Sequence, residues 1–179
     1  IAVEPRAMRA LMAKTAAGLP RDSEGHFRYS EGWFGPFIER VFALELGLDR
    51  GRLEELTGEL LARFRDPATF RLYPHALELL EHLRGRGLSV GIVSNWSEAL
   101  PGILAALGVR ERVDFCLVSA LERAEKPEPE IFRRALARAA SEPGEAIHAG
   151  NDVGLDVRGA LASGILPVLV DHGHRAGGA

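Results

Sequence analysis

Closely spaced polar residues follow an apolar run near the C-terminus of this 179-residue chain. In "AIHAGNDVGLDVRGA", residues 146–160, the run stops at Gly150, and Asn151, Asp152 and Asp156 come directly after it. Two carboxylates this close repel each other unless a cation or hydrogen-bond donors lie between them. Hard oxygen ligands of this kind suit Mg²⁺. We therefore expect Asp152, Asp156 and Asn151 to contribute to a metal site.

Two further apolar runs are followed by polar groups of a complementary kind. "GIVSN" ends in Ser94 and Asn95, and the run "VDFCLVS" is followed after a short loop by Lys126 in "EKPEP". A hydroxyl, an amide and a fixed cation suit a phosphate ester. We expect Ser94, with the free N–H groups of the following helix, to cradle phosphate oxygens while Lys126 balances their charge.

Each of these signals has a purely structural alternative. Ser94 and Asn95 suit a helix N-cap, "EKPEPEIF" suits a helix start, and Asp156 suits an acid in a first helical turn. Chance could place any one of these residues after an apolar run, but it explains all of them together much less well. The combination therefore favours a binding site.

The elements that would position these residues fall into two parts. Residues 1–66 show helical periodicity without strand-like alternation, whereas from residue 74 helices alternate with four apolar runs, 88–95, 113–120, 145–152 and 165–171. Such alternation predicts an α/β fold with a parallel sheet buried on both faces. The loops after parallel strands open at one edge, where ligands bind. We expect an all-helical unit over 1–70 and an α/β core over 71–179, joined near two prolines in "DPATFRLYP".

Composition excludes several classes of protein. The chain is 46% hydrophobic with a net charge of -3, which suits one domain, or one domain with a small insertion, and gives no basic footprint for nucleic acid or a membrane surface. It has no apolar run of about 20 residues and no recognisable signal peptide, so we expect a cytoplasmic protein. Lys14 and Lys126 are its only lysines and it has no glutamine, a composition typical of a thermophile or of a GC-rich genome. The sequence does not indicate an oligomeric state.

The motifs "GIVSNW", "EKPEPEIFRRAL" and "HAGNDVGLDVRGA" resemble, in order and spacing, the second, third and fourth motifs of the haloacid dehalogenase-like (HAD) hydrolase superfamily. The resemblance covers about residues 72–171, and the helical unit before them is similar to the cap of that family. It implies a HAD-like Rossmannoid core with a helical cap. It also implies that Ser94 binds the phosphoryl group, that Lys126 serves the nucleophile and the phosphate, and that Asp152 and Asp156 form the Mg²⁺ site.

Two departures from the family pattern matter. Family members commonly have Gly-Asp where this chain has Gly150-Asn151, which leaves open whether Asn151, Asp152 or Asp156 touches the metal directly. The first motif, an Asp-x-Asp whose leading aspartate is the family's nucleophile, does not occur in the chain. We therefore expect the first, central strand of the sheet to be missing and the chain to be a partial record of a longer protein.

The favoured function is a magnesium-dependent phosphatase that acts on a small phosphate ester through a phospho-aspartyl intermediate. A 2-haloacid dehalogenase uses the same fold without metal, and the Asp152/Asp156 pair argues against it. A non-catalytic HAD-like binding module is the alternative from a different class. The cap aromatics of "HFRYSEGWFGPF" suit either a specificity wall or the cap core. Trp96, next to Ser94 and Asn95, either faces the cap or packs under it.

Overall fold

The computed structural model describes residues 4–23 and 25–171, and its first part is mainly helical. Its helices are α1 (Pro5–Gly18), α2 (Glu31–Glu39), the π-helical turn η1 (Arg40–Glu45) and α3 (Arg50–Arg65). Ser30 Oγ caps α2 by accepting from the Trp33 N–H, and Asp49 caps α3 by accepting from the Arg52 N–H. These side chains satisfy N–H groups that the first turn of a helix leaves without partners.

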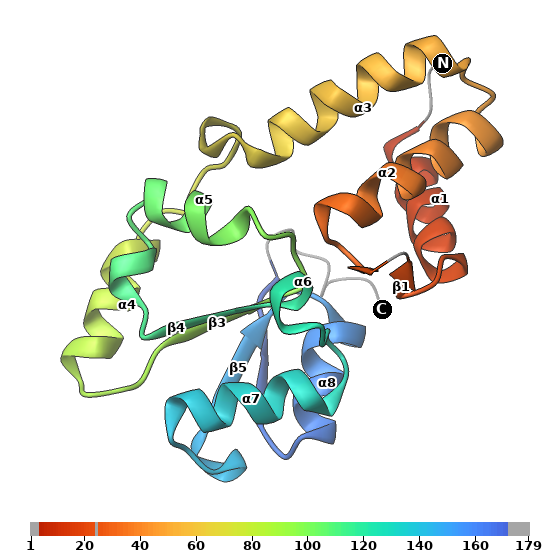
Figure 1. Cartoon of the computed structure of the whole chain (residues 1–179). Helices are drawn as coiled ribbons and strands as arrows, with labels where there is room; N and C mark the ends of the chain where they lie inside the picture. The colour runs from red at the N-terminus through yellow and green to blue at the C-terminus, as the bar shows by residue number, and fades with distance from the viewer. Residues whose placement is uncertain (1–3, 24, 172–179) are drawn as a thin grey trace.

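The cap region is not entirely helical, which corrects the expectation from the sequence. Two short antiparallel strands, β1 (Asp22–Ser23) and β2 (His26–Phe27), form a hairpin between α1 and α2. Each strand has only two residues, too few to produce the alternation by which strands are recognised in a sequence. Figure 1 shows α1, α2 and α3 grouped apart from the longer strands.

The second part alternates helices and strands as predicted. The strands are β3 (Gly91–Ser94), β4 (Phe115–Val118), β5 (Ile147–Gly150) and β6 (Leu166–Leu169), one inside each predicted run. The helices are α4 (Ala76–Gly85), α5 (Leu100–Ala106), α6 (Ser119–Glu122), α7 (Pro129–Ala139) and α8 (Arg158–Ala162). Three-residue 3₁₀ turns lie at Pro67–Thr69, Arg110–Arg112 and Pro143–Glu145, and a π-helical turn, η5 (Val153–Val157), precedes α8.

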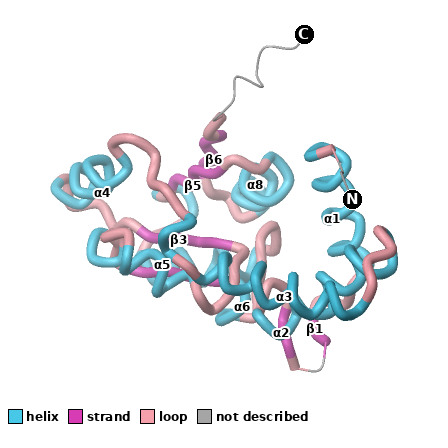
Figure 2. The backbone as a smooth tube through the Cα atoms, turned by 90° about the horizontal axis from the view of Figure 1, so that it is seen from above, coloured by secondary structure: helices cyan, strands magenta, loops and turns pink. Residues whose placement is uncertain are grey.

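The strands pair in two parallel couples and do not form one sheet within the described residues. Ile92 of β3 pairs with Cys116 of β4, and His148 of β5 pairs with Pro167 of β6. No ladder joins the β3–β4 couple to the β5–β6 couple in this part of the chain. Figure 2 shows β3 lying apart from β5 and β6. The parallel direction is confirmed, and the expectation that a central strand is missing stays a prediction.

Two apolar clusters hold the described residues together. One comprises Trp33, Phe37, Ile38, Val41 and Leu53, all from the first part of the chain. The other comprises Ala124, Ile131, Phe132, Ala160 and Ile165, with Val93 and Ala146 packed against it. Because Val93 belongs to β3 and Ala146 precedes β5, the second cluster connects the two strand couples. The division of the chain at residue 70 stays a prediction, and it agrees with this separation of the clusters.

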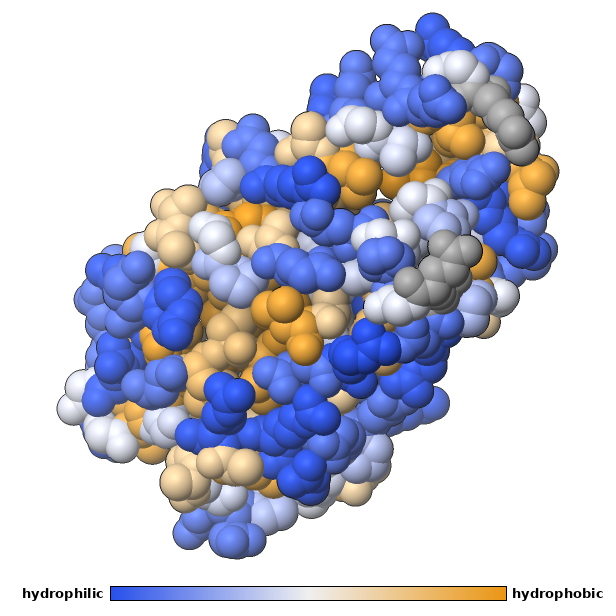
Figure 3. Space-filling view, in the orientation of Figure 1, coloured by the Kyte–Doolittle hydropathy of each residue, from blue (hydrophilic) through white to orange (hydrophobic). Residues whose placement is uncertain are grey.

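The strands are not equally buried, whereas the sequence predicted a sheet buried on both faces. Phe115, Leu117 and Val118 of β4 are buried, but Ile147 of β5 and Leu166 of β6 keep more than half of their surface exposed. On the face shown in Figure 3, apolar surface is interrupted by hydrophilic residues. None of the helices in the described residues combines the length and the apolar character needed to cross a membrane.

Candidate active site

A carboxylate held by three donors lies at the centre of the polar cluster. Asp156 Oδ1 accepts from Lys126 Nζ at 2.5 Å and lies 3.0 Å from His148 Nε2, while Asp156 Oδ2 accepts from the Asp152 backbone N–H at 3.0 Å. The exposed fraction is only 12% for the Lys126 side chain and 6% for that of Asp156. The ion pair is thus largely removed from water. Because the surrounding protein screens charge poorly, the attraction between the two side chains is strong and holds them in one geometry.

These contacts determine the ionisation of Asp156. Burial raises the pKa of the carboxyl, but hydrogen bonds from Lys126, His148 and the Asp152 backbone outweigh burial and leave the pKa below its ordinary value. The carboxylate therefore stays charged at neutral pH and holds the Lys126 ammonium in one place.

Gly150 permits this close packing. An added Cβ at Gly150, the last residue of β5, would lie 2.2 Å from Asp156 Cγ, far closer than non-bonded carbon atoms approach each other. The absence of a side chain at the strand end thus lets the Asp156 carboxylate fold back against the β5 backbone.

Asn95 joins the end of β3 to the loop that carries Lys126. Its side-chain Oδ1 accepts from the Lys126 N–H at 2.8 Å, and its Nδ2 donates to the Lys126 carbonyl at 2.9 Å. The backbone N–H and the backbone carbonyl of Lys126 are therefore both hydrogen-bonded to one amide side chain. This pair of bonds brings together two of the residues that the sequence predicted to converge, Asn95 and Lys126.

Asp152 is held differently from Asp156. Its Oδ1 accepts from the N–H groups of Gly154 and Leu155 at 2.7 and 2.8 Å, so it caps the following turn. Its Oδ2 and the Asn151 side chain have no hydrogen-bonding partner among the described residues, and both residues are exposed. Hard oxygen atoms free at a strand end fit a magnesium ion. The described residues include no cluster of three or more His, Cys, Asp or Glu that could hold a metal, so the metal site stays a prediction.

The carboxylates of Asp152 and Asp156 each have donors within the chain, and the Lys126 ammonium is one of those that hold Asp156. One expectation about the site needs correction. The helix after Ser94 begins only at Leu100, has seven residues and lacks a side-chain cap. Pro101 sets its start, and Ser97 Oγ accepts from the Ala99 N–H in the preceding loop. The N–H groups of that helix therefore do not lie beside Ser94, whose side chain has no hydrogen bond to another described residue.

Sequence reasoning missed His148 and Glu125. His148 lies inside a strand, and its ring also meets Phe132 edge-on at a centroid distance of 5.2 Å. Glu125, directly before Lys126, is buried and lies 3.2 Å from both Arg21 Nε and Arg28 Nη1 of the cap region. Burial raises the pKa of Glu125, and the two guanidinium groups offset only part of that effect. A charged residue beside "KPEP" was the only signal for Glu125 in the sequence.

Comparison with known proteins identifies the class to which this arrangement belongs. A family model of haloacid dehalogenase-like hydrolases matches residues 9–164. The chain therefore belongs to the haloacid dehalogenase-like hydrolase family, and the resemblance drawn from its three motifs is confirmed.

Two curated relatives illustrate the match. The chain is 36% identical over 141 residues to mouse haloacid dehalogenase-like hydrolase domain-containing protein 3, covering 79% of this chain and 56% of the relative. It is 37% identical over 150 residues to a phosphoserine phosphatase of Thermus thermophilus, covering 80% of this chain and 58% of the relative. The chain thus spans less than two thirds of the length of these relatives.

Solved structures agree on the fold. A HAD phosphatase from Thermococcus onnurineus superposes with a TM-score of 0.62 and 27% identity, over 95% of this chain and 72% of that one. A dehalogenase superposes with a TM-score of 0.74 and 22% identity, over all of this chain and 76% of that one, which speaks for the fold alone. The predicted HAD-like α/β fold is therefore confirmed.

Proposed function

We propose that the whole protein is a magnesium-dependent phosphatase that hydrolyses a small phosphate monoester through a phospho-aspartyl intermediate. The observation that carries this proposal is the edge formed by the ends of β3 and β5. There a fixed ammonium, Lys126, lies beside a strand-end loop with a free carboxylate oxygen, Asp152 Oδ2, and a free amide, Asn151. Positive charge and hard oxygen ligands together suit a phosphoryl group and Mg²⁺.

The residues of the chain take distinct roles in this proposal. Lys126 stabilises negative charge on the phosphoryl oxygens, and Asp156 with His148 keeps its ammonium in position. Ser94 lies at the end of β3, where its hydroxyl is free to donate to the phosphoryl group. Asp152 and Asn151 would hold Mg²⁺, and Asp156 is the poorest metal ligand of the three because its carboxylate already accepts three hydrogen bonds. When bound, Mg²⁺ supplies further neutralisation of phosphoryl charge.

The nucleophile in this proposal is an aspartate on an additional parallel strand between β3 and β5. Within the described residues β3 pairs only with β4, and β5 only with β6, so one edge of each has unpaired backbone groups. A buried unpaired group costs about 1–3 kcal/mol, which a strand between the couples would recover. An aspartate at the end of that strand would lie at the same edge as Lys126.

The chemical steps are those of acyl phosphate formation and hydrolysis. A carboxylate oxygen attacks phosphorus, the bond from phosphorus to the ester oxygen breaks, and the leaving oxygen takes a proton from a general acid. Water then attacks phosphorus, its proton passes to the same group, now acting as base, and phosphate leaves as the carboxylate is restored. Lys126 takes no part in these proton transfers. Its charge stabilises a phosphoryl oxygen by about 4 kcal/mol at a separation near 4 Å and an effective dielectric of 20.

The test uses the natural gene product with p-nitrophenyl phosphate. We expect phosphate release that stops on exhaustive chelation and returns with added Mg²⁺. Turnover that survives chelation would overturn the role of the metal. Chloride release from 2-chloropropionate in place of phosphate release would assign the protein to the dehalogenases, and binding of phosphate esters without any turnover would assign it to non-catalytic modules.

A further inference from the structure

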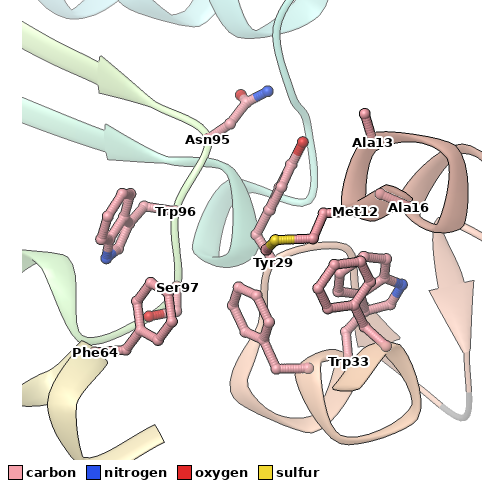
Figure 4. A pocket seen from close by; sticks show the side chains of 11 residues that line it. Met12, Ala13, Ala16, Tyr29, Trp33, Phe64, Asn95, Trp96 and Ser97 are labelled. Carbon is pink, nitrogen blue, oxygen red and sulfur yellow. The ribbon is translucent and has the colours of Figure 1, made fainter. Parts of the chain in front are cut away.

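An apolar pocket of about 300 Å³ lies between the cap region and the end of β3. Its walls are contributed by α1, the start of α2, the end of α3 and the loop after β3. In Figure 4, Met12, Tyr29 and Trp33 border it on one side, and Phe64 of α3 and Trp96 of the loop after β3 border it on the other. The alternatives for the aromatics are thereby resolved in part: Trp33 and Phe37 belong to the cap core and also line this pocket, and Trp96 faces the cap.

The pocket borders the candidate active site at Asn95. Asn95 lines it, and the same side chain holds both backbone polar groups of Lys126. Ser94, at the end of β3, is the residue directly before Asn95. A group bound in the pocket would therefore lie next to the end of β3, where the phosphoryl group is proposed to meet Ser94 and Lys126.

The lining selects for apolar groups. None of the described residues that line the pocket is an acid, a lysine, an arginine or a histidine, and most are aromatic or aliphatic. An ammonium or a carboxylate placed there would lose its hydration without gaining a charged partner, which is costly. Tyr29, Asn95 and Ser97 provide only neutral polar groups. An apolar chain or ring placed there would instead gain free energy in proportion to the area removed from water.

The backbone at Tyr29 supports a binding role for this pocket. Tyr29 has a φ of 68°, in the left-handed region that residues with a side chain adopt rarely. Residues in such conformations cluster at active sites and ligand clamps, and Tyr29, unlike His75, Arg123 and Ala140, is not a helix cap. The tyrosine ring lies 5.9 Å from that of Trp33, and both rings line the pocket.

We infer that this pocket binds the leaving group of the substrate, and that the substrate is a phosphate monoester of an uncharged, apolar alcohol or phenol. The inference rests on the proposed phosphatase function and extends it to the substrate class. It sets this chain apart from its phosphoserine phosphatase relative, since serine carries an ammonium and a carboxylate for which the described pocket has no counter-charge.

The kinetic test compares alkyl phosphates whose leaving groups have similar reactivity. The natural gene product is assayed with ethyl, n-butyl and n-hexyl phosphate and with O-phosphoserine. We expect kcat/KM to rise about threefold for each added methylene, or roughly 80-fold from ethyl to hexyl, and to be lowest for O-phosphoserine. The same kcat/KM for all alkyl chains, or a preference for O-phosphoserine, overturns the inference while leaving the phosphatase intact. No phosphate release from any ester, p-nitrophenyl phosphate included, overturns the proposed function as well.

A matched pair of variants locates the effect in the pocket. Ala13 lines the pocket, whereas Ala17, one turn later on α1, is exposed and does not. Ala13→Phe is expected to reduce the gain per methylene, and Ala17→Phe is expected to preserve it. An equal gain in both variants would place the alkyl chain elsewhere.

A binding measurement remains informative even if Ala13→Phe fails to fold. Both tryptophans of the chain, Trp33 and Trp96, line the pocket, so their fluorescence reports its occupancy. Non-hydrolysable n-hexylphosphonate is expected to change the emission of the unaltered protein saturably, and methylphosphonate is expected to leave it unchanged. Inhibition by n-hexylphosphonate without any change of emission would contradict binding at this place.

Discussion

Lys126 Nζ and Asp156 Oδ1 lie 2.5 Å apart, and neither side chain has more than 12% of its surface exposed. The ammonium is therefore held by a partner within the protein before any substrate arrives. Only the remaining donors of Lys126 are available to a ligand, and their direction is set by Asp156. Interactions fixed in advance in this way cost little reorganisation during a reaction.

Lys126→Met is expected to lower kcat by about two orders of magnitude, corresponding to roughly 3 kcal/mol, because no other lysine lies in the α/β part of the chain. It should also lower the melting temperature, since Asp156 loses a donor within a buried site. Phosphate release and thermal unfolding measure the two effects. Lys14→Met, at an exposed position on α1, is the matched control. Near-normal turnover of Lys126→Met would mean that "EKPEP" is only a helix start.

His148 is expected to act as a positioning residue through Asp156. His148→Leu removes a hydrogen bond to a charged group and should lower kcat roughly tenfold, consistent with about 1.5–3 kcal/mol for such bonds. His148→Gln keeps an N–H donor and should recover part of the loss. Steady-state kinetics compare the two, with His82→Gln on the exposed face of α4 as control. Equal rates for the Leu and Gln variants would indicate that the histidine only fills space.

Gly150→Ala is expected to be strongly disruptive, because the new Cβ meets Asp156 Cγ at 2.2 Å. Relief of such a clash typically costs about 1–3 kcal/mol and would here move the carboxylate away from Lys126. Gly102→Ala, within α5, meets nothing within 4 Å and should be neutral or slightly stabilising. Denaturant unfolding and kcat are the measurements. A Gly150→Ala protein as stable and active as the Gly102→Ala protein would show that Asp156 lies elsewhere in solution.

Asp156 should make stability depend on acid pH. Its pKa in the folded protein lies below the ordinary value, so the folded state binds the proton less readily than the unfolded state. The stabilisation is therefore fully present above the ordinary aspartate pKa of about 3.9, and it is lost as pH falls through the lower pKa of the folded protein. Melting temperatures of the unaltered protein and of Asp156→Asn should converge as pH falls. Curves that stay parallel below pH 4 would contradict this role.

The fold and the main site residues were predictable because they follow from local patterns. Strand runs separated by helices place Asn95, Lys126 and Asp156 at successive strand ends, and parallel strands bring such ends together. The two bonds between Asn95 and Lys126 join positions 31 apart in the sequence, yet both residues were identified from their places after apolar runs.

Other features depend on contacts that carry no local signal. His148 looks like any strand residue until Asp156 is seen beside it. Arg28 and Glu125 are 97 positions apart, and nothing in either neighbourhood of the sequence points to the other. The helix α5 begins late because Ser97 forms a turn before it and Pro101 favours the first helical turn. The apolar periodicity of residues 97–108 predicts a helix but not the residue at which it begins. The two-residue strands β1 and β2 are too short to show the alternation of apolar and polar residues that predicts a strand.

The ion pairs between the cap hairpin and the Lys126 loop limit how freely the cap can be exchanged. Arg21 and Arg28 contact Glu125, Arg21 also pairs with Glu128, and Arg123 pairs with Asp22. A cap grafted from a relative without these arginines would leave the Glu125 carboxylate buried and uncompensated next to Lys126. The hairpin and residues 123–128 are therefore coupled, and a cap chimera would need both transferred as one unit.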